Sequence, residues 1–122
     1  MMNKERLFGY SIGNNIIVDI QRNIVFGIIH GKKIQAITLR TTMMRLLIYM
    51  LETSGHRIVS NNEIMIQVWE NHQLSASSQR LWQVMRELKK KLSLPGLPEE
   101  FIMRIESKGY FLKCVDHESQ RL

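Results

Sequence analysis

The chain has 122 residues, which is the usual size of one domain with a core of its own. Apolar residues make up 44% of it and charged residues 23%, and these ordinary values argue against wholesale disorder. Lys and Arg number 17 against 11 Asp and Glu, so the formal net charge is +6. This balance favours an anionic partner such as nucleic acid or an acidic membrane surface.

Several classes of protein are not supported by the sequence. The single cysteine, Cys114, excludes an internal disulfide and a zinc site built from several cysteines, and its apolar surroundings predict a small core residue. The histidines have no paired spacing, so we expect no metal and no cofactor. No nucleophile elbow, phosphate-binding glycine loop or carboxylate pair is present, so an enzyme is not predicted. No apolar run has the length of a membrane span and no secretory leader is present, which predicts a cytoplasmic protein.

Residues 7–39 consist of short β-rich runs separated by turn residues. The runs are residues 7–12, 16–19, 24–29 and 34–39. This spacing predicts a small antiparallel sheet. Because such short strands are not stable alone, we expect later elements to cover the apolar face of the sheet.

Three helices are predicted next. Thr41 or Thr42 can cap the first, which ends near Ser54 and carries a wide apolar face of Met43, Met44, Leu46, Leu47, Met50 and Leu51. The methionines at this spacing are expected to fill the core. The second helix starts at the capping-box sequence of residues 60–63 and ends near Asn71. The third spans residues 77–92.

The third helix carries two opposed stripes. At about 100° per residue, one side is apolar and consists of Leu81, Val84, Met85, Leu88 and Leu92. The other side consists of Gln79, Gln83, Arg86 and Lys90. Amide and guanidinium groups can read base edges and cations can hold phosphates, so the pattern predicts a DNA-recognition helix. The alternative is an ordinary surface helix with a solvated polar face.

The C-terminal part predicts a β-hairpin. Pro95, Gly96 and Pro98 end the third helix, and residues 101–106 and 110–115 alternate around the turn at residues 107–109. The polar residues from Asp116 on are expected to fray. We therefore predict one α+β domain over residues 1–115, with an N-terminal antiparallel sheet, three helices and a hairpin, followed by a polar tail over residues 116–122. This order is typical of a winged helix-turn-helix, whose third helix enters the major groove and whose hairpin wing lies on the backbone or minor groove.

Five short segments on these elements carry a resemblance to a known family. They are LRTTMMRLL at residues 39–47, GHRIVS at 55–60, VW at 68–69, LKKKL at 88–92 and IESKGYF at 105–111. Over about residues 7–113 the chain resembles the OmpR/PhoB-type winged-helix DNA-binding domain of transcriptional regulators. Two residues depart from the family pattern: Met43 replaces the usual Glu, and Lys89 replaces the usual Arg. The second change exchanges a forked donor for a point charge at an expected phosphate contact.

The resemblance implies sequence-specific binding of double-stranded DNA by a bacterial-type transcriptional regulator. Gln79, Gln83 and Arg86 are the candidates for reading bases, since amides pair with adenine and arginine pairs with guanine. Trp82 borders them and would contact a thymine methyl or a sugar, or else cover the neighbouring loop. The candidates for phosphate contact are Arg80, Lys89, Lys90, Arg104 and Lys108.

The position of the winged helix is also informative. It begins within about ten residues of Met1, which is similar to the ToxR/CadC group, whose members carry a cytoplasmic winged helix followed by a membrane span. Two expectations stay open: the cytoplasmic part of a membrane-tethered regulator, and a small free-standing regulator. The resemblance also implies RNA polymerase as a partner of the loop at residues 70–77, and a homodimer on paired half-sites. The alternative functions are a degenerate winged helix that binds an acidic protein or an anionic surface, and an RNA-binding winged helix.

Overall fold

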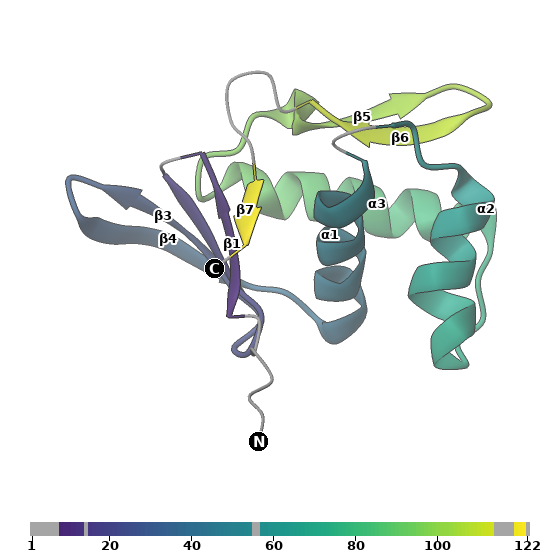
Figure 1. Ribbon diagram of the computed structural model, residues 1–122, viewed down its shortest axis with the longest axis horizontal. Helices are drawn as coiled ribbons and strands as arrows, with labels where there is room; N and C mark the ends of the chain where they lie inside the picture. The colour runs from purple at the N-terminus through teal and green to yellow at the C-terminus, as the bar shows by residue number, and fades with distance from the viewer. Residues whose placement is uncertain (1–7, 14, 55–56, 114–118, 122) are drawn as a thin grey trace.

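The computed structural model describes residues 8–13, 15–54, 57–113 and 119–121. Figure 1 shows an N-terminal sheet on one side, helix α1 (Thr41–Thr53) at the centre, and a β-hairpin along one edge of the helices. The order of elements is sheet, helices and hairpin, which confirms the predicted winged-helix architecture. Within the described residues, no helix has both the length and the apolar character needed to span a membrane.

The N-terminal sheet forms from the predicted β-rich runs. Its first four strands pair antiparallel in chain order: β1 (Gly9–Ile12), β2 (Ile16–Asp19), β3 (Ile24–Ile29) and β4 (Lys32–Thr38). Apolar side chains alternate along the strands, and those on the inner face, such as Val18 and Val25, are fully buried. They belong to one core cluster with the apolar face of α1, which is the expected cover.

A fifth strand completes the sheet and corrects one expectation. Residues predicted to fray instead include β7 (Ser119–Arg121), which pairs antiparallel with β1 and gives the strand order β4-β3-β2-β1-β7. Pairing of this kind satisfies the backbone groups of an otherwise open sheet edge and needs no apolar side chains. The strand was not predicted because its residues are polar and lack the apolar alternation of the other strands. Cys114 lies outside the described residues.

Helix α1 is the centre of the core. The six residues of its predicted apolar face are buried, and Met43, Met44 and Met50 are at most 2% exposed, which confirms that they fill the core. The predicted cap is wrong. The N-cap is Arg40, which is in extended conformation and makes no side-chain bond to the helix, because Thr41 is already the first helical residue.

The second helix has three conformations in succession. A short α-helical part, α2 (Asn61–Ile64), continues as the π-helical turn η1 (Met65–Trp69) and the 3-10 turn η2 (Glu70–His72). The Ser60 hydroxyl accepts a hydrogen bond from the Glu63 N–H at 3.1 Å, so the predicted start is confirmed. Val68 and Trp69, in the π-helical turn, are both buried in the core.

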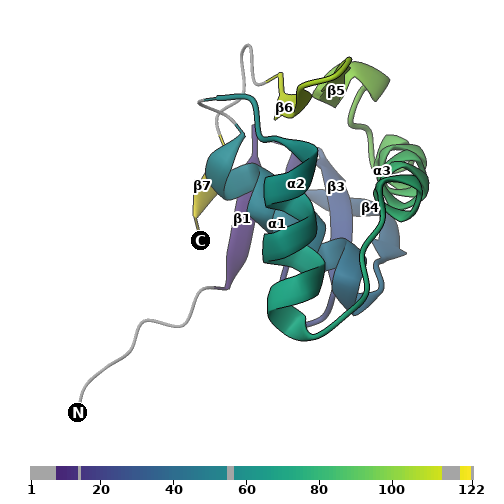
Figure 2. The same ribbon diagram turned by 90° about the vertical axis from the view of Figure 1, so that its right-hand side faces the viewer.

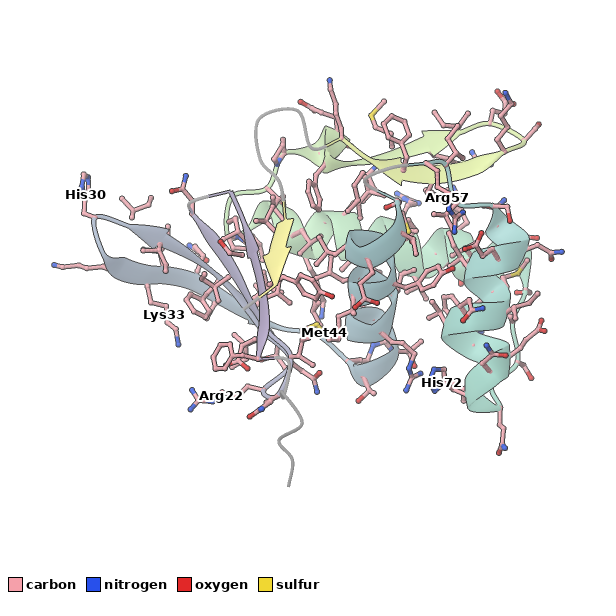
Figure 3. The ribbon with its side chains drawn as sticks, viewed as in Figure 1. Arg22, His30, Lys33, Met44, Arg57 and His72 are labelled. Carbon is pink, nitrogen blue, oxygen red and sulfur yellow. The ribbon has the colours of Figure 1, made fainter. Side chains whose placement is uncertain are left out.

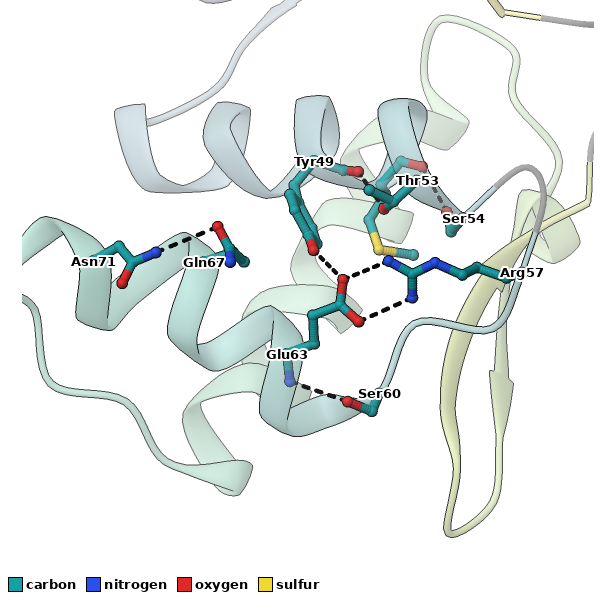
Figure 4. A network of polar contacts seen from close by, with 9 residues as sticks. Tyr49, Thr53, Ser54, Arg57, Ser60, Glu63, Gln67 and Asn71 are labelled. Atoms are coloured by element: carbon teal, nitrogen blue, oxygen red, sulfur yellow. Dashed lines mark hydrogen bonds and ion pairs between the residues drawn. The ribbon is translucent and has the colours of Figure 1, made fainter.

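A polar cluster fixes the segment before α2 (Figure 4). The Arg57 guanidinium donates two hydrogen bonds to the Glu63 carboxylate, at 2.9 and 2.7 Å, and the Tyr49 hydroxyl donates a third. Arg57 first and Tyr49 second lower the pKa of Glu63 to about 2. Burial, followed by the Glu63 carboxylate, raises the pKa of Tyr49. The carboxylate thus ties α1 and α2 to the chain between them.

The hairpin is docked onto this same segment. It consists of β5 (Ile102–Ile105) and β6 (Gly109–Leu112), and the backbone groups of Val59 and Tyr110 exchange hydrogen bonds of 2.8 and 2.9 Å. Gly109 has φ +147°, and a Cβ at this position would lie 2.0 Å from the carbonyl oxygen of Val59. Only glycine permits this approach. Tyr49, Arg57, Val59, Glu63 and Tyr110 are called the junction below.

The third helix, α3 (Ser78–Ser93), begins where the sequence predicts. The Ser77 hydroxyl accepts a hydrogen bond from the Arg80 N–H at 3.0 Å. One side of the helix is buried in the core, through Leu81, Met85, Leu88 and Leu92. Figure 2 shows α3 nearly end-on at the margin of the molecule, with the hairpin above it.

Candidate nucleic-acid interface

The polar stripe of α3 faces away from the core. Gln79, Gln83, Arg86 and Lys90 are all exposed, and Trp82 at the edge of the stripe is 41% exposed. These five residues are called the α3 outer face below. The helix therefore has the two-sided character that its periodicity predicts, and the structure brings the candidate base-reading residues together on one surface.

Trp82 and Arg86 are in contact with each other. The guanidinium carbon of Arg86 lies over the Trp82 ring, 4.9 Å from the ring centroid. This distance is that of a cation–π interaction. The sequence predicted either a DNA contact or loop packing for Trp82. Its spacing of four residues from Arg86 also places the two side chains on adjacent turns of one helix face.

One flank of the α3 outer face adjoins the start of α1. Arg40 and Glu87 form an ion pair of 3.7 Å between the two helices. Arg40 and Arg80 also line a groove of about 350 Å³ together with Ser75 of the preceding loop. Arg40 was missed by the sequence reasoning, because no local pattern shows that the residue before α1 lies beside α3.

The other flank adjoins the chain that leads into the hairpin. Lys89 is half-buried, and with Lys90 and Glu99 it lines a second groove, of about 330 Å³. Glu99 opens the short 3-10 turn η3 (Glu99–Phe101), which precedes β5. The predicted phosphate contacts on α3 are therefore divided, with Arg80 toward α1 and Lys89 toward the hairpin.

The last two candidates belong to the hairpin itself. Arg104 is exposed and lies opposite Tyr110 across the two strands. Burial raises the pKa of Tyr110, and the guanidinium of Arg104 partly offsets this effect. Lys108 is exposed in the turn between the strands, where its N–H donates to the carbonyl of Ile105 at 3.0 Å.

The described histidines do not form a site. His30 lies at the outer end of the hairpin formed by β3 and β4, whereas His72 lies at the end of the second helix, on the opposite side of the molecule (Figure 3). His56 and His117 lie outside the described residues. Across the part of the chain that the structure describes, His, Cys, Asp and Glu form no group of three that could hold a metal ion.

Comparison with known families assigns the fold to a class of proteins. The model of a family described as "Transcriptional regulatory protein, C terminal" matches residues 34–112, which include α1, α2, α3 and the hairpin. The chain belongs to this family, the OmpR/PhoB-type DNA-binding domains, and is a sequence-specific DNA-binding domain of a transcriptional regulator. A comparison with curated protein sequences found no match.

Solved structures of such domains have a similar fold. The DNA-binding domain of CadC from E. coli has a TM-score of 0.69 and 21% identity, over 90% of this chain and 94% of that one. The domain of the response regulator AdeR, in complex with an intercistronic region, has a TM-score of 0.65 and 22% identity, over 82% and 95%. The domain of RstA from Klebsiella pneumoniae, in complex with the RstA box, has a TM-score of 0.60 and 17% identity, over 85% and 95%.

Proposed function

We propose that α3 enters the major groove of DNA with its outer face toward the base edges. The observation that carries this proposal is the exposed row of two amides, a guanidinium and an ammonium on a helix whose opposite side is buried. The major groove, roughly 12 Å wide, admits such a helix. The hairpin of β5 and β6 would then lie against the backbone or the minor groove, as in other winged helices.

Each exposed side chain has a role that follows from its chemistry. Gln79 and Gln83 would pair with adenine, and Arg86 with guanine O6 and N7. Trp82 borders this row and contacts Arg86. The cations around this row would contact phosphates: Arg80 on the α1 flank, Lys89 and Lys90 on the hairpin flank, and Arg104 and Lys108 on the hairpin. Phosphate contacts fix the register, and Gln79, Gln83 and Arg86 select the sequence.

The loop at residues 70–77 is proposed as the surface that contacts RNA polymerase. It contains an exposed apolar side chain, Leu74 (42% exposed), and an exposed acidic one, Glu70. We further propose that two copies bind paired half-sites on DNA and that the domain acts in the cytoplasm. A membrane anchor outside this domain would leave the arrangement intact, since the proposed DNA-binding surface consists of α3 and the hairpin.

The test is selection of preferred sites from a randomised duplex library, followed by fluorescence-polarisation titration. We expect tighter binding to a selected site than to a scrambled one, and affinity that falls as salt rises. Equal affinity for both duplexes would contradict base reading. No measurable affinity for either at low salt would favour a module that binds an acidic partner, and equal competition by structured RNA would favour an RNA-binding domain.

A further inference from the structure

We propose that Trp82 is a positioning residue, which holds the Arg86 guanidinium in place before DNA binds and thereby sets the preference for guanine. This inference rests on the proposed function of α3. It assigns Trp82 a role that acts through Arg86, instead of a direct contact with a base. The observation behind it is the placement of the guanidinium over the Trp82 ring, 4.9 Å from its centroid.

The first step concerns the acidic group of α3. An arginine on a helix surface pairs with a carboxylate three or four residues away, and α3 has no carboxylate at those distances from Arg86. The acidic residue of α3, Glu87, is adjacent to Arg86 in the chain and therefore faces a different side of the helix. In this structure Glu87 pairs instead with Arg40, on the α1 flank, at 3.7 Å. The contact described for Arg86 is the one with the ring of Trp82, on the other side of the outer face.

The second step concerns the donors of Arg86. An ion pair engages the N–H groups of a guanidinium, which are the groups that must bind guanine O6 and N7. A contact over a ring engages the charge and leaves the N–H donors free. Arg86 can therefore keep its contact with Trp82 while its donors bind a base.

The third step concerns conformational freedom. A long arginine side chain loses rotational freedom when it binds, and this loss opposes association. A ring already in contact restricts the side chain beforehand, so less freedom is lost on binding. Trp82 is exposed enough to act in this way without being part of the core, since 41% of its surface is accessible. Removal of its ring should weaken guanine recognition and leave the fold intact.

The first measurement needs no DNA. In the NMR spectrum of the full chain, the side-chain protons of Arg86 should show a ring-current shift that Trp82→Ala abolishes and that Trp82→Phe retains in part. Phe8→Ala is the matched control, because Phe8 is also an exposed aromatic residue (48% exposed) but lies outside α3. Unchanged Arg86 shifts in Trp82→Ala would overturn the proposal.

The second measurement is a double-mutant cycle on a selected duplex that contains the preferred guanine. Trp82→Ala should lower affinity roughly two- to fivefold when Arg86 is present and have no effect in an Arg86→Ala background. Trp82→Phe should restore part of the loss. An equal loss in both backgrounds would overturn the proposal and indicate direct contact between Trp82 and DNA. A wild-type chain without sequence preference would instead contradict the proposed function, and this inference with it.

Discussion

The junction and the α3 outer face contain the same kinds of residue and use them differently. Each combines an arginine with an aromatic side chain, and a glutamate lies in one and beside the other. In the junction the Arg57 guanidinium donates both of its described hydrogen bonds to Glu63, and Tyr49 binds the same carboxylate. On α3, the described contact of Arg86 is with a ring. The junction uses its polar groups to hold the fold, whereas the outer face keeps donors available for a ligand.

The ion pair of the junction and the ion pair beside the α3 outer face also differ in length and exposure. Arg57 and Glu63 approach to 2.7 Å, and the carboxylate side chain is only 28% exposed. Arg40 and Glu87 are 3.7 Å apart, with side chains 70% and 54% exposed. An exposed pair of this kind contributes little to stability. Residue type alone therefore does not distinguish a structural ion pair from a weak surface pair; the distance and the exposure of the side chains do.

Gly109→Ala should have the largest effect and should act on the junction. The new Cβ would lie 2.0 Å from the Val59 carbonyl oxygen, at a φ of +147° that side chains rarely adopt. We expect a loss of roughly 2–4 kcal/mol in the free energy of unfolding, measured by urea denaturation. Gly31→Ala is the matched control. Its φ is +76° with no atom within 4 Å of the added Cβ, so strain alone should cost about 1 kcal/mol. Equal losses in the two variants would show that the hairpin is not docked as described.

Arg86→Ala should act on binding and leave stability unchanged. Loss of a bidentate contact with guanine is expected to cost about 1–3 kcal/mol on the selected site and to relax the preference at one base pair. The unfolding free energy should change by less than about 0.5 kcal/mol, because the residue is exposed. Titration against the selected and scrambled duplexes measures both effects. An equal loss on the two duplexes would remove Arg86 from the base-reading set.

Lys90→Ala and Lys108→Ala should each have a smaller effect that does not depend on sequence. A phosphate contact adds about 0.9 to the slope of log affinity against log salt, and each variant should lose one such contact. Titration of selected and scrambled duplexes at several salt concentrations gives the slope. A variant that weakens only the selected duplex would belong to the base-reading set instead.

Glu63→Gln should have the smallest effect, because solvent screens a pair whose arginine is half-exposed. The pKa of Glu63 is lowered from 4.5 to about 2, so its stabilising effect is complete above pH 4.5 and is lost as pH falls toward 2. The wild type should therefore be more stable than the variant at neutral pH, and the difference should shrink between pH 4.5 and pH 2. A difference that stays constant across this range would contradict the pairing.

The elements with strong periodicity were predictable from the sequence. The apolar residues of α1 and α3 recur at helical spacing, and those of the strands alternate. Because each element buries one face, this spacing indicates whether a segment is a helix or a strand. The N-caps of α3 and α2, Ser77 and Ser60, were predictable because their hydroxyls accept hydrogen bonds from N–H groups of the first helical turn. The chemistry of the outer face followed from the stripe opposite the core.

The features that escaped prediction depend on contacts between distant residues. Strand β7 is polar and pairs only through its backbone, and the bridge between Val59 and Tyr110 joins segments far apart in the chain. Arg40 lies beside α3 only because of the way α1 packs. No local sequence pattern predicts these contacts.

The most direct test of the central claim replaces the preferred guanine of a selected site by 7-deazaguanine. This base pairs normally but lacks the N7 acceptor in the major groove, so only a major-groove contact is lost. Wild-type affinity should fall on the order of tenfold, and the affinity of Arg86→Ala should not change. If the wild type binds both duplexes equally, or if both proteins lose affinity to the same extent, then Arg86 on α3 does not read guanine from the major groove.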